Sequence, residues 1–145
     1  MAVKKCIGVL SLVLALNSAA NEWNQWRGPN RNGSTAESDW SHQWGKEGPK
    51  KLWEARIGAG YSNLCVSGKT GFTLGFDGMN GSACVFNVYA LDLETGKVRW
   101  KTRIPPGTGS KKFGSTSFSS PVTDGKLVYA LGGHGEFAAL KADSG

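Results

Sequence analysis

Few residues of this chain have side chains and spacings suited to chemistry. His134 lies in a glycine-rich run with Glu136, and a histidine beside a carboxylate is able to bind a metal or transfer a proton. The run falls between two strand-like segments that need a tight turn, and the matching position of an earlier, similar unit is Gly75–Gly78. We therefore predict a hairpin turn at His134. His42 stands alone in a different region.

The stretch Asp77–Gly81 is the second candidate. Calcium loops place acidic residues at alternate positions and end in a glutamate, and this stretch has neither feature. It is predicted to be a hairpin turn instead. The glycine-rich runs do not lead into a helix, as a phosphate-binding loop requires, and no Ser-His-Asp or Cys-His set can be assembled. The sequence predicts no catalytic, cofactor-binding or metal-binding residue.

The element that must position everything else is the stretch Tyr89–Trp100, which reads YALDLETGKVRW. An apolar run ends at Asp92, turns through Gly96-Lys97 and leaves towards Trp100, which predicts a strand, a tight turn and a second strand. A partial copy closes the sequence, where Ala139–Gly145 aligns with Ala90–Gly96. We interpret the chain as a repeat that ends in mid-repeat.

A second set of matches extends the repeat. Tyr61–Val66 matches Phe118–Thr123, and Phe72–Gly75 matches Tyr129–Gly132, both with an offset of 57 residues. Each unit reads as four short strands joined by turns, and the first unit carries additional residues around Gly78–Cys84 in a variable hairpin loop. A repeat of this length built from strands is typical of a β-propeller blade. The predicted fold is therefore all-β, a partial β-propeller of four-stranded antiparallel blades with about one and a half blades present.

The repeat also predicts how the strands are distributed. Lys51–Ile57 is predicted to be a strand equivalent to Lys97–Ile104, with Trp53 matching Trp100 at a distance of 47 residues. Tyr61–Ile104 is then one whole blade and Phe118–Gly145 three strands of the next. A lone strand before the first whole blade suggests a ring closed by the N-terminal strand.

Residues 1–20 have the features of a secretory signal peptide. A short basic start precedes the apolar stretch Ile7–Leu16, and small residues follow, so cleavage is expected after Ala20. The apolar stretch is too short to span a bilayer, and Cys6 lies before it rather than after it, which argues against lipidation. We expect a secreted or periplasmic protein with no membrane span.

Residues 21–50 form a second region, rich in tryptophan and without a strand or helix period. Four tryptophans in an irregular segment expose a large apolar surface, so we predict an ordered arm that lies across the sheets. A platform for an aromatic or glycan ligand is the alternative. The tryptophans are Trp23, Trp26, Trp40 and Trp44.

Charge and cysteine content limit the functional classes. The net charge is +6, and removal of residues 1–20 takes away two lysines and no acid, which leaves +4. The basic residues alternate with apolar ones along strands, so we expect solvated strand faces and no nucleic-acid partner. Cys65 and Cys84 are able to pair in an oxidising compartment, and the sequence leaves that question open.

The repeat resembles the pyrroloquinoline-quinone-type (PQQ-like) repeat family of β-propellers over residues 51–145. The family hallmark, A-x-D-x-x-x-G-K-x-x-W, is matched by Ala90, Asp92, Gly96, Lys97 and Trp100, and Trp53 occupies the tryptophan position of the preceding unit. The resemblance implies a structural motif in which the tryptophan docks on the neighbouring blade, held by the Asp and the Gly-Lys turn.

The same resemblance implies two kinds of function. The first is a non-catalytic secreted scaffold that binds a protein or small molecule at the propeller face and needs further blades or another chain to complete the ring. The alternative is the N-terminal part of a quinoprotein alcohol or sugar dehydrogenase that uses pyrroloquinoline quinone (PQQ) and Ca²⁺. The adjacent Cys-Cys pair and the acidic cluster common in those dehydrogenases are not found in this sequence, so the scaffold is favoured.

Overall fold

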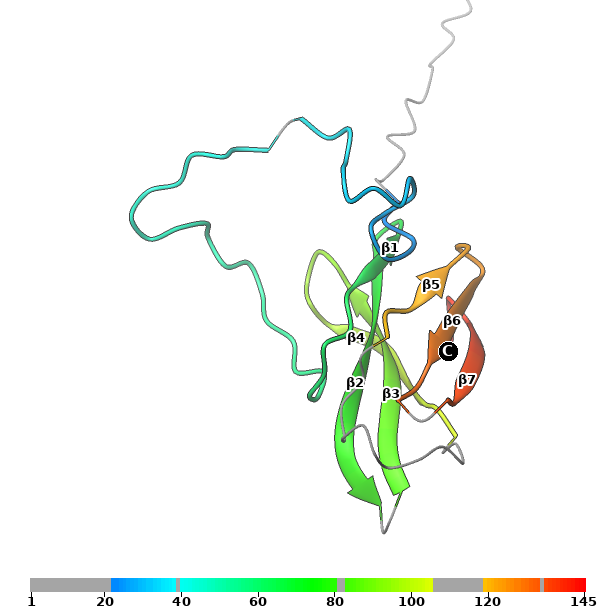
Figure 1. Ribbon diagram of the computed structural model, residues 1–145. Coiled ribbons are helices and arrows are strands. Elements are labelled where there is room, and N and C mark those ends of the chain that lie inside the picture. Colours follow the sequence, from blue (N-terminus) through cyan, green and yellow to red (C-terminus); the bar gives the residue numbers. More distant parts are fainter. Residues whose placement is uncertain (1–21, 39, 81–82, 106–118, 134) are drawn as a thin grey trace, which may run out of the picture.

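A computed structural model describes residues 22–38, 40–80, 83–105, 119–133 and 135–145 (Figure 1). Within these ranges the chain has no helix, so none that could cross a membrane, and its strands form two antiparallel sheets with strand order β1-β2-β3-β4 and β5-β6-β7. The predicted all-β class, with a four-stranded blade followed by three strands of another, is confirmed. The strands are β1 Cys65–Ser67, β2 Thr70–Asn80, β3 Ala83–Asp92, β4 Val98–Arg103, β5 Val122–Thr123, β6 Leu127–Leu131 and β7 Phe137–Lys141.

The strand registers reproduce the sequence repeat. Phe72 pairs with Ala90 across β2 and β3, and Tyr129 pairs with Ala139 across β6 and β7. Leu131 pairs with Phe137 in the second sheet, as Leu74 pairs with Val88 in the first. Because side chains alternate between the faces of a strand, the equal registers place equivalent residues on equivalent faces.

The hydrophobic core lies between the two sheets, which stand side by side in Figure 1. One face of the first sheet packs on the opposite face of the second sheet, and hydrophobic burial of this kind contributes about 1.5–3 kcal/mol for each large side chain. The packed residues are Phe72, Leu74, Phe86, Val88 and Ala90 from the first sheet, with Val128 and Ala130 from the second.

The hairpin of β2 and β3 corrects one prediction. Asp77–Gly81 was expected to form the turn, but β2 continues through Asp77 to Asn80, and the pairing shifts by one residue between Phe76 and Met79. This shift is a β-bulge in the middle of a long hairpin. The additional residues of the first unit therefore lengthen both strands rather than form a loop.

Lys51–Ile57 is not a strand, contrary to prediction. The segment is extended and runs over the first sheet, where it ends in a two-way hydrogen-bonded bridge between Ala59 and Phe76. The carbonyl of Ile57 lies so close to Gly75 that a Cβ at this position would collide with it. The crossing of the segment over β2 therefore depends on the glycine at position 75.

The N-terminal arm is hydrogen-bonded to both sheets near its start. Trp23 exchanges two backbone hydrogen bonds with Val66 in β1, of 3.2 and 2.8 Å, and the carbonyl of Asn24 accepts one of 2.9 Å from Thr123 in β5. The cyan part of the arm swings away from both sheets (Figure 1). Trp26, Trp40 and Trp44 are 62%, 60% and 60% exposed. The prediction that the four tryptophans of the arm pack across the sheets is wrong for these three, and only Trp23 of the four lies against a sheet.

Candidate functional site

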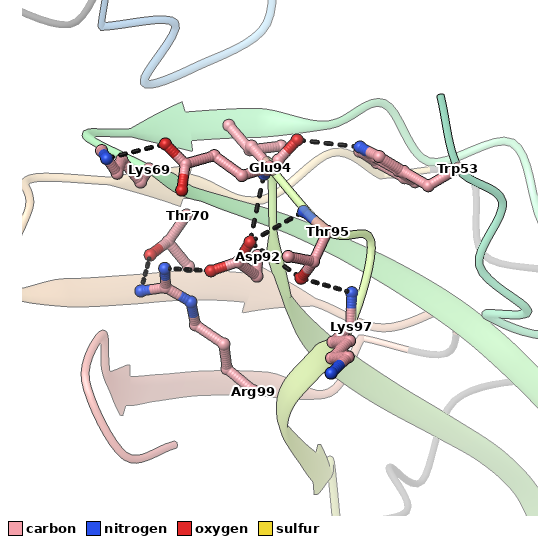
Figure 2. Close-up of polar contacts among 9 residues, drawn as sticks. Trp53, Lys69, Thr70, Asp92, Glu94, Thr95, Lys97 and Arg99 are labelled. Atoms are coloured by element: carbon pink, nitrogen blue, oxygen red, sulfur yellow. Dashed lines mark hydrogen bonds and ion pairs between the residues drawn. The ribbon is translucent and has the colours of Figure 1, made fainter. Parts of the chain in front are cut away.

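The turn after β3 is organised by one carboxylate. Oδ1 of Asp92 accepts hydrogen bonds from the backbone N–H groups of Glu94 and Thr95, of 3.1 and 2.9 Å, and from the Thr95 hydroxyl at 2.9 Å (Figure 2). A backbone bond from Gly96 to the Asp92 carbonyl, of 2.8 Å, closes the turn. Aspartate is suited to this position because its short side chain reaches the N–H groups two and three residues ahead.

An arginine completes this network from the neighbouring strand. β4 has a bulge at Arg99, since Val98 pairs with Leu91 and Trp100 with Ala90. The Arg99 guanidinium donates to Oδ2 of Asp92 at 2.6 Å and to the Thr70 hydroxyl at 2.8 Å. These bonds, first the one from Arg99 and then those within the turn, lower the pKa of Asp92 to about 2. The carboxylate is therefore charged at any physiological pH.

Trp53 lies on this turn. Its indole Nε1–H donates to the carbonyl of Leu93 at 2.8 Å (Figure 2), and its ring covers Gly96. A Cβ on Gly96 would lie 2.6 Å from the ring, and this residue has a φ of +70°, which disfavours other residues. Glycine is thus required at this position for two reasons: the backbone of the turn has a positive φ, and a side chain would collide with the Trp53 ring.

Trp100 makes the same contact with the second sheet. Its indole Nε1–H donates to the carbonyl of Ala142 at 3.0 Å, and its ring covers Gly145, the counterpart of Gly96. The ring also packs on Phe72, with centroids 5.8 Å apart. One copy of the hallmark therefore serves two contacts: its turn receives Trp53, and its tryptophan reaches the next turn.

The remaining hallmark residues act through the backbone. The Lys97 carbonyl accepts from the N–H of Asp92 at 2.8 Å, and the Lys97 N–H donates to the Thr95 hydroxyl at 3.4 Å. Ala90 is fully buried, and it pairs with Trp100 across β3 and β4. The hydrogen bonds of the Asp92 side chain run to its own turn and to Arg99, so it supports the turn on which Trp53 lies.

A polar cluster that the sequence did not reveal lies on the other face of the first sheet. Asp77 accepts from the Tyr89 hydroxyl at 2.7 and 2.8 Å and from Asn87 at 2.8 Å, and it forms an ion pair with Lys101. Burial alone would raise the pKa of Asp77, but the hydrogen bonds from Lys101, Tyr89 and Asn87 lower it overall. Burial, followed by the bond to Asp77, raises the pKa of Tyr89. The alternation of side chains along β3 is a signal that could have placed Asn87 and Tyr89 on one face, but Asp77 was predicted to lie in a turn.

Cys65 and the turn around His134, two other candidates from the sequence, lie in places that serve the fold. Cys65 is a free thiol in the core, so the disulfide left open by the sequence is not formed, and burial raises its pKa to about 12. The connection from β6 to β7 is the predicted hairpin turn, closed by a bond from Gly132 N–H to the Glu136 carbonyl of 2.7 Å. His134 itself lies outside the described residues, as does the predicted signal peptide.

Comparison with known families agrees with the geometry of the two sheets. A family model of PQQ-like repeats, described as outer membrane protein assembly factor BamB, matches residues 30–145. The chain belongs to this PQQ-like repeat family. No curated protein matches the chain.

The described residues of this PQQ-like repeat chain do not fit a Ca²⁺ ion. Calcium takes six to eight oxygen ligands, several of them from carboxylates. No group of three His, Cys, Asp or Glu residues gathers in the described ranges. The oxygens of Asp77 and Asp92 are occupied by the donors named above, and a cation stands beside each.

The pocket at the seam between the two sheets is poorly suited to PQQ. A pocket of about 290 Å³ lies at the seam between the sheets, with Arg99, Thr70 and Asp143 in its lining. An anionic quinone would need the guanidinium, which Asp92 and Thr70 already bind, and it would lie beside the carboxylate of Asp143. These surroundings disfavour it.

Proposed function

We propose that this chain is a non-catalytic scaffold in which stacked blades present a binding surface to a protein. Six residues are proposed to be structural parts of two tryptophan-docking contacts, of which the Trp100 contact joins the two sheets: Ala90, Asp92, Gly96, Lys97, Trp100 and Trp53. The carboxylates of the described chain support this role, because those of Asp77 and Asp92 stabilise strands and turns and are not directed at a ligand.

The observation that carries the proposal is a difference between equivalent faces. Leu74 and Val88 of the first sheet are 1% and 0% exposed, since the second sheet covers them. Their counterparts by register, Leu131 and Phe137, are 48% and 68% exposed, and Val122 on the same sheet is 40% exposed. A sheet face that is built for packing in one unit is exposed in the next. Exposed apolar faces of this kind mark interaction sites.

We propose that this face receives another antiparallel sheet, either a further blade of the same repeat or a sheet of a partner protein. A sheet would bury the apolar side chains and, along an edge strand, supply main-chain hydrogen bonds. The family description, which names an assembly factor, agrees with a protein as the partner.

The proposal is tested by charge substitutions on the exposed face. Leu131→Glu and Phe137→Glu are expected to abolish association of the protein, measured by sedimentation velocity over a range of concentrations. The matched control is Val98→Glu, which places the same charge at an apolar residue that is 46% exposed on the first sheet. The wild type is expected to associate because a second copy of the chain supplies a sheet of the same repeat. A wild-type protein that stays monomeric, with a Phe137→Cys thiol that is labelled as fast as in urea, would exclude such a sheet and leave only a partner protein.

The dehydrogenase alternative makes a separate prediction. If the chain formed part of a quinoprotein, added PQQ and Ca²⁺ would support dye reduction with an alcohol or glucose. We expect no reduction above background and no quenching of tryptophan fluorescence by PQQ. Saturable quenching would instead place the chain among the quinone-binding members of the family.

We further propose that the protein is exported to the cell envelope, with the signal peptide cleaved after Ala20. The basic start and apolar stretch of residues 1–20 support this, as does the outer-membrane protein named in the family description. N-terminal sequencing of the protein from the periplasmic fraction should begin at Asn21. An N-terminus at Met1 in the cytosolic fraction would contradict export.

A further inference from the structure

The loop Gln25–Gly33 is unusually well fixed for a segment without strands. Three backbone hydrogen bonds close it: Gly28 to Gln25 at 3.0 Å, Arg31 to Gly28 at 3.1 Å and Gly33 to Arg27 at 2.9 Å. The Asn32 side chain adds a bond from the N–H of Ser34 at 3.0 Å. The loop therefore has a defined shape and pays little ordering entropy when it binds a ligand.

The loop is also anchored to both sheets. The backbone of Gly28 lies on the ring of Trp23, since a Cβ there would be 2.7 Å from the ring. Trp23 is bonded to Val66 of β1, and Asn24 to Thr123 of β5. These are the first strands of the two sheets, so the loop is held beside both of them.

Two arginines in this loop have a costly backbone conformation. Arg27 has a φ of +63° and Arg31 a φ of +56°, and they are the only residues other than glycine with positive φ in the described chain. Asparagine or glycine would adopt this conformation more easily. Strained residues are concentrated at binding and catalytic sites, so the presence of arginine at both positions points to a use for its charge.

Neither guanidinium has a carboxylate partner among the described residues. Arg27 donates from Nη2 to the Asn32 carbonyl at 3.2 Å, and Arg31 donates from Nε to the Gln25 side chain at 3.3 Å. Each bond uses one of five N–H donors and orients the group. The remaining donors form a planar fork that matches a carboxylate or a phosphate.

The same loop carries an exposed aromatic side chain. Trp26 directly precedes Arg27 in the loop, and its side chain is 62% exposed. A tryptophan offers a large flat apolar face and loses little entropy on binding, so it is suited to cover a ring. The loop therefore combines a stacking surface with two oriented cations.

We infer that the loop Gln25–Gly33 binds an acidic carbohydrate, in which a sugar ring covers Trp26 and a carboxylate or phosphate is held by Arg27 and Arg31. The ligand is expected on these side chains and not in the neighbouring pocket of about 290 Å³, because Glu22 and Glu37 line that pocket. This site is separate from the exposed face of the second sheet, and it stands or falls independently of the scaffold proposal.

The test measures the binding of oligogalacturonate to the whole protein by calorimetry and by tryptophan fluorescence. Saturable binding is expected, with at least tenfold weaker binding for Trp26→Ala and for the double variant Arg27→Asn/Arg31→Asn. The matched controls are Trp44→Ala, an equally exposed tryptophan outside the loop, and Arg56→Asn, an exposed arginine in the extended segment. Both controls should bind like the wild type.

Stability separates a role in binding from a role in folding. Because asparagine tolerates positive φ, Arg27→Asn/Arg31→Asn should unfold at the same urea concentration as the wild type or at a higher one, while its affinity falls. Three outcomes would overturn the inference. In the first, methyl-esterified oligogalacturonate binds as tightly as the free acid. In the second, polyglutamate binds as tightly as oligogalacturonate while Trp26→Ala has no effect, and in the third, single-stranded oligo-dT binds more tightly than the sugar acid.

Discussion

The turn Asp92–Gly96 and the turn Lys141–Gly145 hold a tryptophan in the same way with different side chains. Each is closed by a bond of 2.8 Å from the glycine N–H to the carbonyl four residues earlier. Each is also bonded to the turn between the first two strands of its own sheet. The Leu93 N–H donates to the Lys69 carbonyl at 3.0 Å, and the Ala142 N–H donates to the Lys126 carbonyl at 2.9 Å. The backbone of the contact is thus repeated almost without change.

The side chains at the start of the two turns are of opposite charge. Asp92 accepts hydrogen bonds from its own turn and from Arg99. The equivalent residue of the second turn is Lys141. The side-chain bond described within that turn runs from the Ser144 hydroxyl to Asp143 at 3.0 Å. The comparison teaches that a backbone carbonyl and a glycine suffice to dock the tryptophan. The carboxylate is an additional support for one turn.

The largest effect in this comparison is expected from the tryptophans. Trp100→Ala should lower the free energy of unfolding by about 3–5 kcal/mol, because Trp100 packs on the core between the sheets. Trp53→Ala should cost about 2 kcal/mol, because it joins one sheet to an extended segment. Urea unfolding measures both, with Trp44→Ala as the exposed control. Equal losses would mean that the two contacts are of equal weight.

A smaller effect is expected at the glycine. Gly96→Ala should cost about 2 kcal/mol, since the new Cβ is strained at positive φ and collides with Trp53. Gly48→Ala is a matched control, because Gly48 has a φ of +71° and no atom within 4 Å of its Cβ position. The control should lose only about 1 kcal/mol. In a Trp53→Ala background the two glycine substitutions should become alike, and a persistent difference would argue against the ring contact.

The carboxylate of Asp92 should be visible as a pH dependence. Its pKa in the folded protein is about 2, below the ordinary value near 4, so its contribution is complete above about pH 4 and is lost as the pH falls towards 2. Asp92→Asn should therefore flatten the decrease of the urea midpoint between pH 5 and pH 2. A variant with an unchanged acid limb would show that other carboxylates cause the decrease.

The smallest effect tests whether the support can be transferred. Lys141→Asp should place a carboxylate within reach of the N–H groups of Asp143 and Ser144, as Asp92 does for its own turn. A gain of about 1 kcal/mol in the free energy of unfolding is expected. A loss in the same urea measurement would mean that the second turn positions these N–H groups differently.

The strands were predictable because their physical causes are local. Alternation along Val98–Ile104, glycines in the turns and the 57-residue offset together indicate four-stranded units, and the registers follow them. The docking partners were predictable only in part, since a shared motif does not say which turn receives which tryptophan.

Errors occurred where tertiary context decides. Lys51–Ile57 has a strand pattern, but its backbone crosses the first sheet above Gly75 and pairs only at Ala59. Asp77–Gly81 reads as a turn, but residues 77–80 belong to β2, where the cluster around Asp77 holds that residue. Exposure of Trp26, Trp40 and Trp44 could not be foreseen from their apolar character, because an arm without strands has no fixed face to pack.

Hydrogen exchange by mass spectrometry on Trp100→Ala and Trp53→Ala tests most directly the claim that Trp100 joins the two sheets. The account predicts that Trp100→Ala loses protection in β6 and β7, on the second sheet, while Trp53→Ala leaves those strands protected. Unchanged protection of β6 and β7 in Trp100→Ala, or an equal loss in both variants, would contradict it.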